Sequence, residues 1–126
     1  VVTSGNLPGK ITVEFATGAR FEANEAEGEG EVRRYAFAPE AGLPSAPAGR
    51  LVSFAELKQG QTVIGLSGSG GAVTGIIARI DDYLHTDLPE IPLGAAGVNL
   101  SGDIVGISLG DGRFVLADRV SALLAP

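Results

Sequence analysis

The sequence predicts an all-β barrel domain with one short C-terminal helix. Nineteen glycines and seven prolines are spread over 126 residues, which favours many short strands joined by tight turns. Apolar runs recur at near-regular spacing, as in barrels and sandwiches. A 3.6-residue period is kept only at the extreme C-terminus, so long helices are not expected.

The clearest hairpin lies near the N-terminus. Ile11, Val13 and Phe15 alternate with polar residues, and Phe21 and Ala23 resume the alternation after a turn at 16–18. The acidic, glycine-broken segment 25–31 is expected to be a loop or a frayed strand end. Segment 32–38, with aromatic residues two positions apart, is predicted to be another strand.

A Pro/Ala/Gly loop is expected at 39–47, before the second half of the chain. Ser53 and Glu56 have capping-box spacing, which predicts one helical turn through Leu57. Segments 62–66 and 72–80 are apolar and bounded by glycines, as is typical of buried strands. Segment 83–86 is a short further candidate.

The C-terminal region is predicted to form a second hairpin and a helix. Segments 104–109 and 114–117 flank Gly-Asp-Gly at 110–112, a turn sequence suited to positive φ. Asp118 is the expected N-cap of the helix. Val120, Leu123 and Leu124 are its expected apolar stripe.

Composition excludes several classes of partner. The net charge of −6 and only nine Lys and Arg argue against nucleic acid, because neutralising phosphates requires clustered cations. No apolar run approaches the length of a transmembrane helix, so no membrane insertion is expected. The N-terminal residues do not form a signal peptide. The chain has no cysteine and does not begin with methionine, and we expect it to be a piece of a longer product.

Three phrases in the second half carry a family resemblance. They read Gly-Gln-Thr-Val-Ile-Gly at 60–65, Val-Thr-Gly-Ile-Ile-Ala at 73–78 and Val-Asn-Leu-Ser-Gly-Asp-Ile-Val-Gly-Ile at 98–107. Their order and spacing resemble the C-terminal barrel of trypsin-like serine proteases, most closely the bacterial HtrA type. The resemblance implies a single trypsin-like domain over 1–126. Residues 1–50 would be the remnant of a first barrel, and 51–126 a complete second barrel with the helix.

All three catalytic positions depart from that family's pattern. The stretch Val-Thr-Ser-Gly-Asn at 2–6 places Asn6 at the histidine position, and the aspartate position falls on Glu31 or Val32. The serine position falls on Ala96. A neutral amide cannot act as a base near pH 7, and alanine has no nucleophilic atom. Losing the histidine as well as the serine favours an inherited pseudoenzyme over an engineered serine replacement.

The segment Gly94, Ala95, Ala96 and Gly97 is the candidate peptide-binding site. By resemblance its backbone N–H groups would form the oxyanion hole. With alanine in the serine's place, two alternatives stay open: the segment still binds a carbonyl or carboxylate, or it has collapsed. Because the chain starts late relative to the family, the missing first-barrel strands are expected from another chain, from the segment preceding Val1, or from a rearranged barrel.

Three other features favour structural interpretations. His85 has carboxylates at 82 and 87, but it lacks a third strong zinc ligand and is interpreted as a partly exposed loop histidine. The glycine-rich segment 65–71 lacks the lysine of a phosphate loop. The glutamates between 22 and 31 lack calcium-loop spacing and are interpreted as a solvated face. No metal or cofactor is therefore expected.

The functional expectation is a catalytically inactive trypsin-like domain that binds a protein or an extended peptide. It would belong to a larger bacterial protein outside the cytoplasm, in the envelope or secreted. The alternative is an HtrA-like serine endopeptidase whose nucleophile is replaced by Ala96. A third interpretation is an inactive relative that sequesters the substrates of an active enzyme.

Overall fold

The computed structural model describes residues 1–5, 7–15, 17–29, 31–38, 42–43, 50–66 and 71–124. Within these ranges it contains strands, one 3₁₀ turn (η1) and one α-helix. In chain order they are β1 Val2–Ser4, β2 Lys10–Glu14, β3 Arg20–Glu29, β4 Val32–Phe37, η1 Phe54–Glu56, β5 Thr62–Leu66, β6 Ala72–Ile80, β7 Leu84–Thr86, β8 Ala96–Val98, β9 Ile104–Ser108, β10 Arg113–Leu116 and α1 Ala117–Leu124.

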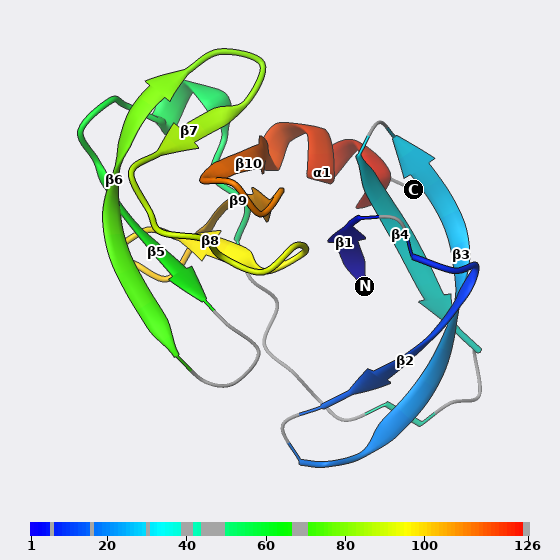
Figure 1. The fold of residues 1–126 in the computed structure, drawn as a ribbon. Coiled ribbons are helices and arrows are strands. Elements are labelled where there is room, and N and C mark those ends of the chain that lie inside the picture. The colour runs from blue at the N-terminus through cyan, green and yellow to red at the C-terminus, as the bar shows by residue number, and fades with distance from the viewer. Residues whose placement is uncertain are drawn as a thin grey trace.

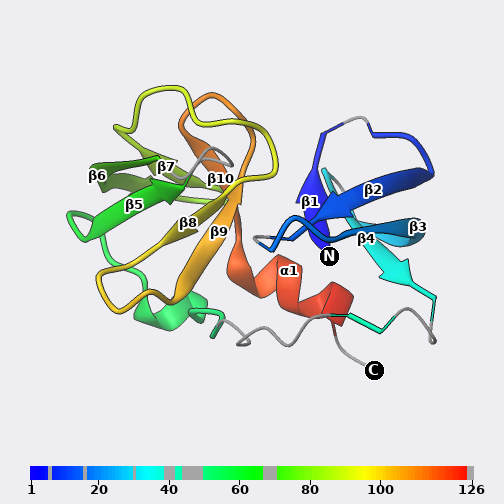
Figure 2. The ribbon, with the colours of Figure 1, turned by 90° about the horizontal axis from the view of Figure 1, so that it is seen from below.

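The strands form two sheets. The half-barrel sheet has the order β1-β4-β3-β2, and the closed barrel has the order β10-β7-β6-β5-β8-β9. Figures 1 and 2 show the curled half-barrel sheet beside the closed barrel, with α1 leaving β10 between them. The helix contacts β9 and β10 as well as β3 and β4. The predicted fold class is therefore confirmed, and the architecture is compatible with a trypsin-like fold.

Most of the predicted strands are present, including the hairpin of β2 and β3 and the hairpin of β9 and β10. Gly110 and Gly112 in the second hairpin turn have φ of 94° and 85°, as the Gly-Asp-Gly sequence predicted. The prediction for 39–47 falls largely outside the described residues. Residues 67–70 of the glycine-rich segment also lie outside them.

The acidic segment 25–31 is more regular than expected. Strand β3 continues to Glu29, with a register shift between Glu25 and Glu27. Two of its glutamates face arginines of β4: Glu25 lies 3.2 Å from Arg33, and Glu27 lies 3.8 Å from Arg34. Opposite charges on neighbouring strands stabilise their pairing. The partners Arg33 and Arg34 lie outside the acidic segment, so the segment's own sequence does not indicate this stabilisation.

Residues 96–98 form a strand, although the segment 94–97 was expected to be a loop. β8 pairs with β5 on one side and β9 on the other, and so it closes the barrel. Gly97 has no side chain where Phe114 packs: a Cβ built there would lie 2.8 Å from the Phe114 ring. Alanine and glycine are poor strand formers, so only the tertiary contacts specify this strand.

The barrel interior is a continuous apolar cluster. It is made by buried residues from the segments on both sides of η1, the strands and the 88–91 loop, namely Val52, Leu57, Val63, Ile77, Leu84, Leu88, Ile91, Val105, Phe114 and Leu116. A second cluster joins Val32 of the half-barrel sheet to Ile107, Val115, Val120 and Leu123. The helix therefore covers the seam between the two sheets.

Helix α1 differs from its prediction in two details. It begins at Ala117, so Asp118 lies in the first turn and is not the N-cap. The Asp118 carboxylate instead accepts a hydrogen bond from the Phe54 backbone N–H at 3.1 Å, at the start of η1. Val120 and Leu123 are buried, but Leu124 is 53% exposed. The apolar stripe is therefore narrower than the sequence indicated.

The predicted helical turn at η1 is confirmed, and the Glu56 side chain bonds back to the N-cap residue as in a capping box. The Ser53 backbone N–H donates to Glu56 Oε2 at 3.1 Å, and the Glu56 N–H donates to the Ser53 carbonyl. In the described part of the chain, no helix is long and apolar enough to cross a membrane.

Candidate functional site

The first candidate site lies where the two sheets meet. Asn6 is outside the described residues, but its neighbour Gly5 lines a cavity of about 290 Å³ together with Glu31. The other lining residues come from both sheets: Arg33, Leu93, Leu109 and Arg113. This cavity thus contains the candidate aspartate position, and Gly5 directly precedes the candidate histidine position in the sequence.

Glu31 is held by the closed barrel and the helix. Its carboxylate accepts hydrogen bonds from the Tyr83 hydroxyl and from Arg119, the latter at 3.3 Å. The Tyr83 hydroxyl is the main cause that keeps the pKa of Glu31 below its ordinary value. Arg113 and Arg119 both lie over the Tyr83 ring, 5.0 and 5.7 Å from its centroid. The carboxylate is therefore engaged in a contact between the two sheets.

Ala96 does not lie in the Glu31 cavity. It lines a separate, mostly apolar cavity of about 430 Å³, together with Gly94 and aliphatic residues of β1, β9 and α1. Leu93, just before the candidate peptide-binding segment, faces Gly5. A Cβ built on Gly5 would lie 3.7 Å from the Leu93 side chain. No sequence motif singled out Leu93, because the resemblance placed the serine position on Ala96.

The backbone of the candidate peptide-binding segment is used within the chain. The Gly94 N–H donates to the Ser108 carbonyl at 2.9 Å, and the Ala95 N–H donates to the Pro92 carbonyl at 3.2 Å. Ala96 and Gly97 pair with Ile107 and Gly106 in the β8–β9 ladder. In this conformation the Gly94 and Ala95 amides are not aimed at a ligand.

His85 lies on β7, and its side chain is 22% exposed. Its Nε2 atom lies 2.8 Å from Asp81 Oδ1 and 3.2 Å from Arg79 Nη2. These partners form a small charged cluster at the β6–β7 turn. No group of three or more His, Cys, Asp or Glu side chains that could hold a metal is found among the described residues.

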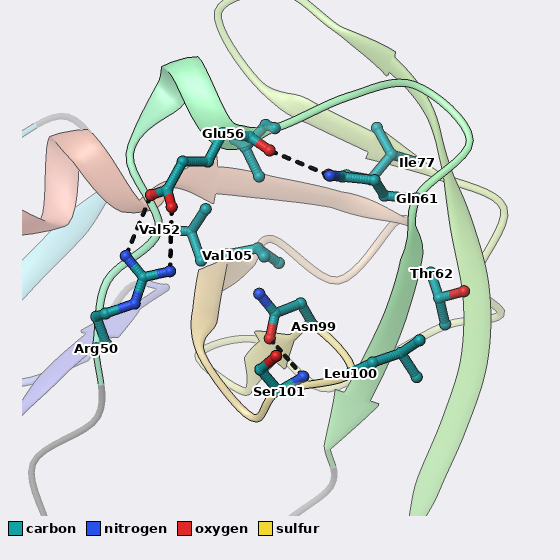
Figure 3. A pocket seen from close by; sticks show the side chains of 11 residues that line it. Arg50, Val52, Glu56, Gln61, Thr62, Ile77, Asn99, Leu100, Ser101 and Val105 are labelled. Carbon is teal, nitrogen blue, oxygen red and sulfur yellow. Dashed lines mark hydrogen bonds and ion pairs between the residues drawn. The ribbon is translucent and has the colours of Figure 1, made fainter.

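A further pocket of about 310 Å³ opens at one end of the closed barrel (Figure 3). Its floor includes the buried residues Val52, Ile77 and Val105, and Leu100 at its rim is 77% exposed. Arg50 at the rim binds Glu56 through both carboxylate oxygens at 3.2 Å, and it also binds Asp103 at 3.1 Å. Both carboxylates therefore hold Arg50 at the rim, and no motif in the sequence predicted this pocket.

The outer edge of the half-barrel sheet is the second candidate site. In the β2–β3 ladder, the Phe15 N–H donates to the Ala19 carbonyl and the Glu25 N–H donates to the Gly9 carbonyl. Because antiparallel bonds alternate along a strand, the odd-numbered residues of β2 bond to β3. The N–H and C=O groups of Lys10, Thr12 and Glu14 therefore point away from β3. No described residue provides a backbone partner for them.

One face of this edge is apolar. Ile11 and Val13 of β2 are half-buried, whereas Lys10, Thr12 and Glu14 on the opposite face are exposed. On the apolar side, the rings of Phe15, Phe21 and Phe37 pack with centroids 5.6 to 6.4 Å apart. A strand that paired with β2 would place alternate side chains beside this half-buried aromatic cluster.

No protein-family model matches this chain, and no curated protein matches it.

Proposed function

We propose that this chain is a catalytically silent barrel domain that binds a protein or an extended peptide by strand addition at β2. It would serve as an interaction module of a larger bacterial protein outside the cytoplasm. That setting, like the trypsin-like and HtrA-like affinity, rests on the sequence resemblance alone.

The observation that carries the proposal is the set of outward-pointing backbone groups of Lys10, Thr12 and Glu14. An unpaired strand edge is a template for another strand, and main-chain hydrogen bonds supply the affinity in such complexes. The half-buried Ile11 and Val13 beside the aromatic cluster supply the apolar contacts that select the partner's alternate residues.

The lining of the Glu31 cavity supports the proposal that the domain is catalytically inactive. The side chains that line it are arginine, glutamate and leucine, beside the glycine at position 5. Acyl transfer to a protein side chain needs a hydroxyl or thiol within reach of a base, and the described residues of this lining include no side-chain hydroxyl or thiol. Ala96 lines a different cavity.

A pair of substitutions at the edge tests the binding proposal. Thr12→Pro removes the outward N–H and retains the ladder to β3, since proline is tolerated on edge strands when its missing N–H faces solvent. Thr12→Ser is the matched control, because it keeps the N–H. Peptides selected from a library of extended octamers are expected to bind wild type and Thr12→Ser, and to bind Thr12→Pro at least about tenfold more weakly by calorimetry. Equal affinity for all three proteins would contradict the proposal.

The enzyme alternative has its own test. If Ala96 stands in for a serine nucleophile, Ala96→Ser would react with a fluorophosphonate probe and hydrolyse casein. We expect no reaction, because residue 96 lies in the β8 ladder and outside the Glu31 cavity. Leu93→Ser, which places a hydroxyl in that cavity, is the sharper control. Labelling of either variant would contradict the silent interpretation.

A further inference from the structure

The sequence of β2 is complementary to itself. It reads Lys-Ile-Thr-Val-Glu, with a cation at one end, an anion at the other and a threonine at the centre. When two such strands are placed antiparallel about Thr12, Lys10 of each copy lies opposite Glu14 of the other. Ile11 of each copy then lies opposite Val13 of the other, on the apolar face.

The outward backbone groups, which have no backbone partner among the described residues, fit the same register. Lys10, Thr12 and Glu14 are the residues whose N–H and C=O groups point outward. In the register centred on Thr12 these three residues lie opposite one another, so every outward group of β2 gains a partner. Shifting the register by two residues loses a pair at one end and places Lys10 opposite Thr12.

From this geometry we propose that the strand which β2 accepts is β2 of a second copy of this chain, an inference that rests on strand addition at β2. The two copies are related by a twofold axis at Thr12, so that one surface patch meets itself. Two half-barrel sheets then become one continuous sheet. Figures 1 and 2 show β2 at the border of the half-barrel sheet, with β3 on its other side.

Charged residues of β3 extend this complementarity beside the β2–β2 contact, which is called the seam between the two copies below. Within one copy, Lys10 Nζ lies 3.1 Å from Glu22, and Glu14 lies 3.1 Å from Arg20. Across the seam, Glu14 is flanked by Arg20 of its own copy and by Lys10 of the other, so cations and anions alternate. Opposite charges on directly facing residues stabilise a strand pair, and like charges destabilise it.

Charge reversal tests the inference by sedimentation velocity over a concentration series. Wild type is expected to dimerise, whereas K10E and E14K each place like charges across the seam and weaken dimerisation by roughly tenfold. An equimolar mixture of K10E and E14K restores opposite charges at both ends and is expected to form heterodimers. The double variant K10E/E14K is expected to dimerise like wild type.

E22K is the matched control. It breaks the same Lys10–Glu22 ion pair as K10E does, but residue 22 lies on β3 and does not face Lys10 or Glu14 across the seam. It is expected to leave dimerisation unchanged. Circular dichroism of each variant checks that the fold is kept. The three substituted side chains, Lys10, Glu14 and Glu22, are highly exposed.

The outcomes separate this inference from the proposed function. Weakened dimerisation of K10E and of E14K alone, together with heterodimers in their equimolar mixture, supports the β2–β2 dimer. A wild type that stays monomeric, or a dimer insensitive to K10E and E14K, overturns it. If the chain is monomeric but still loses peptide binding in T12P, strand addition stands and only the self-pairing fails. If T12P changes neither peptide binding nor association, both proposals fail.

Discussion

Glu31 connects the two sheets through single side-chain contacts. It lies just before β4 of the half-barrel sheet, and its partners are Tyr83 before β7 and Arg119 on α1. Hydrogen bonds to a charged acceptor cost more free energy to break than hydrogen bonds between neutral groups, and the donors to Glu31 lie on two different elements. The sequence marked Glu31 only as a possible catalytic remnant, and the structure gives it a role in joining the sheets.

Tyr83→Phe tests this contact. Removing the hydroxyl is expected to lower the free energy of unfolding by about 1 kcal/mol, measured by urea denaturation at pH 7. The pKa of Glu31 is expected to rise toward its ordinary value in the same variant, because the Tyr83 hydrogen bond is the main cause that lowers it. An NMR titration that gives the same Glu31 pKa in both proteins would contradict the assignment.

Glu56 predicts a pH dependence of stability. Its bidentate contact with Arg50, assisted by Ser53, lowers its pKa from 4.5 to about 2. A folded-state pKa below the unfolded value means that the contact stabilises the fold fully above pH 4.5. The stabilisation is then lost as the pH falls toward 2.

The Glu56→Gln variant provides the measurement. Its thermal midpoint is expected to lie below that of wild type at pH 6, and the gap is expected to shrink as the pH falls below 4.5. The side chain is exposed, so the difference at pH 6 is expected to be small. A gap that stays constant from pH 6 to pH 2.5 would show that the ion pair does not stabilise the fold.

At the scale of single elements, the period-two pattern predicted the hairpins well. Ile11, Val13 and Phe21 alternate with polar and charged residues, and one apolar, half-buried face is enough to fix such strands. Strand β8 was missed because Ala96 and Gly97 have little intrinsic preference for strand conformation. Their placement depends on β5, β9 and the Phe114 ring, which are distant in sequence.

The helix gives a matched test of packing. Leu123 is 3% exposed and packs in the cluster beneath α1, whereas its neighbour Leu124 is 53% exposed. Leu123→Ala is expected to lower the free energy of unfolding by about 2 to 4 kcal/mol, because it leaves a cavity. Leu124→Ala is expected to cost less than about 1 kcal/mol. Equal costs, measured by urea denaturation, would mean that both leucines are buried.

At the scale of the whole molecule, the two sheets meet at a small number of specific contacts. The Ser4 hydroxyl on β1 donates to the Ser108 carbonyl on β9 at 2.6 Å, and both serines are buried. Glu31 and the cluster beneath α1 complete the junction. The Ser4–Ser108 and Glu31–Arg119 contacts join residues that are more than eighty positions apart, and no local pattern in the sequence predicts them.

The fold class is confirmed, whereas the candidate site positions stay predictions. Resemblance placed Asn6, Glu31 and Ala96 together, but Ala96 and Glu31 line different cavities. A shift of three residues, from Ala96 to Leu93, decides which side chain faces Gly5, and one sequence cannot fix such a gap. The sequence predicted that first-barrel strands are missing, but it did not indicate that β2 lies at the edge of the sheet.

Residue-resolved amide hydrogen exchange tests the central claim most directly. In dilute solution, the amides of Lys10, Thr12 and Glu14 are expected to exchange fast, while those of Ile11 and Val13, bonded to β3, are protected. Binding of a peptide or of a second copy is expected to slow exchange at Lys10, Thr12 and Glu14 by at least about tenfold. Uniform protection of all five amides in the monomer, or no added protection on binding, would contradict strand addition at β2.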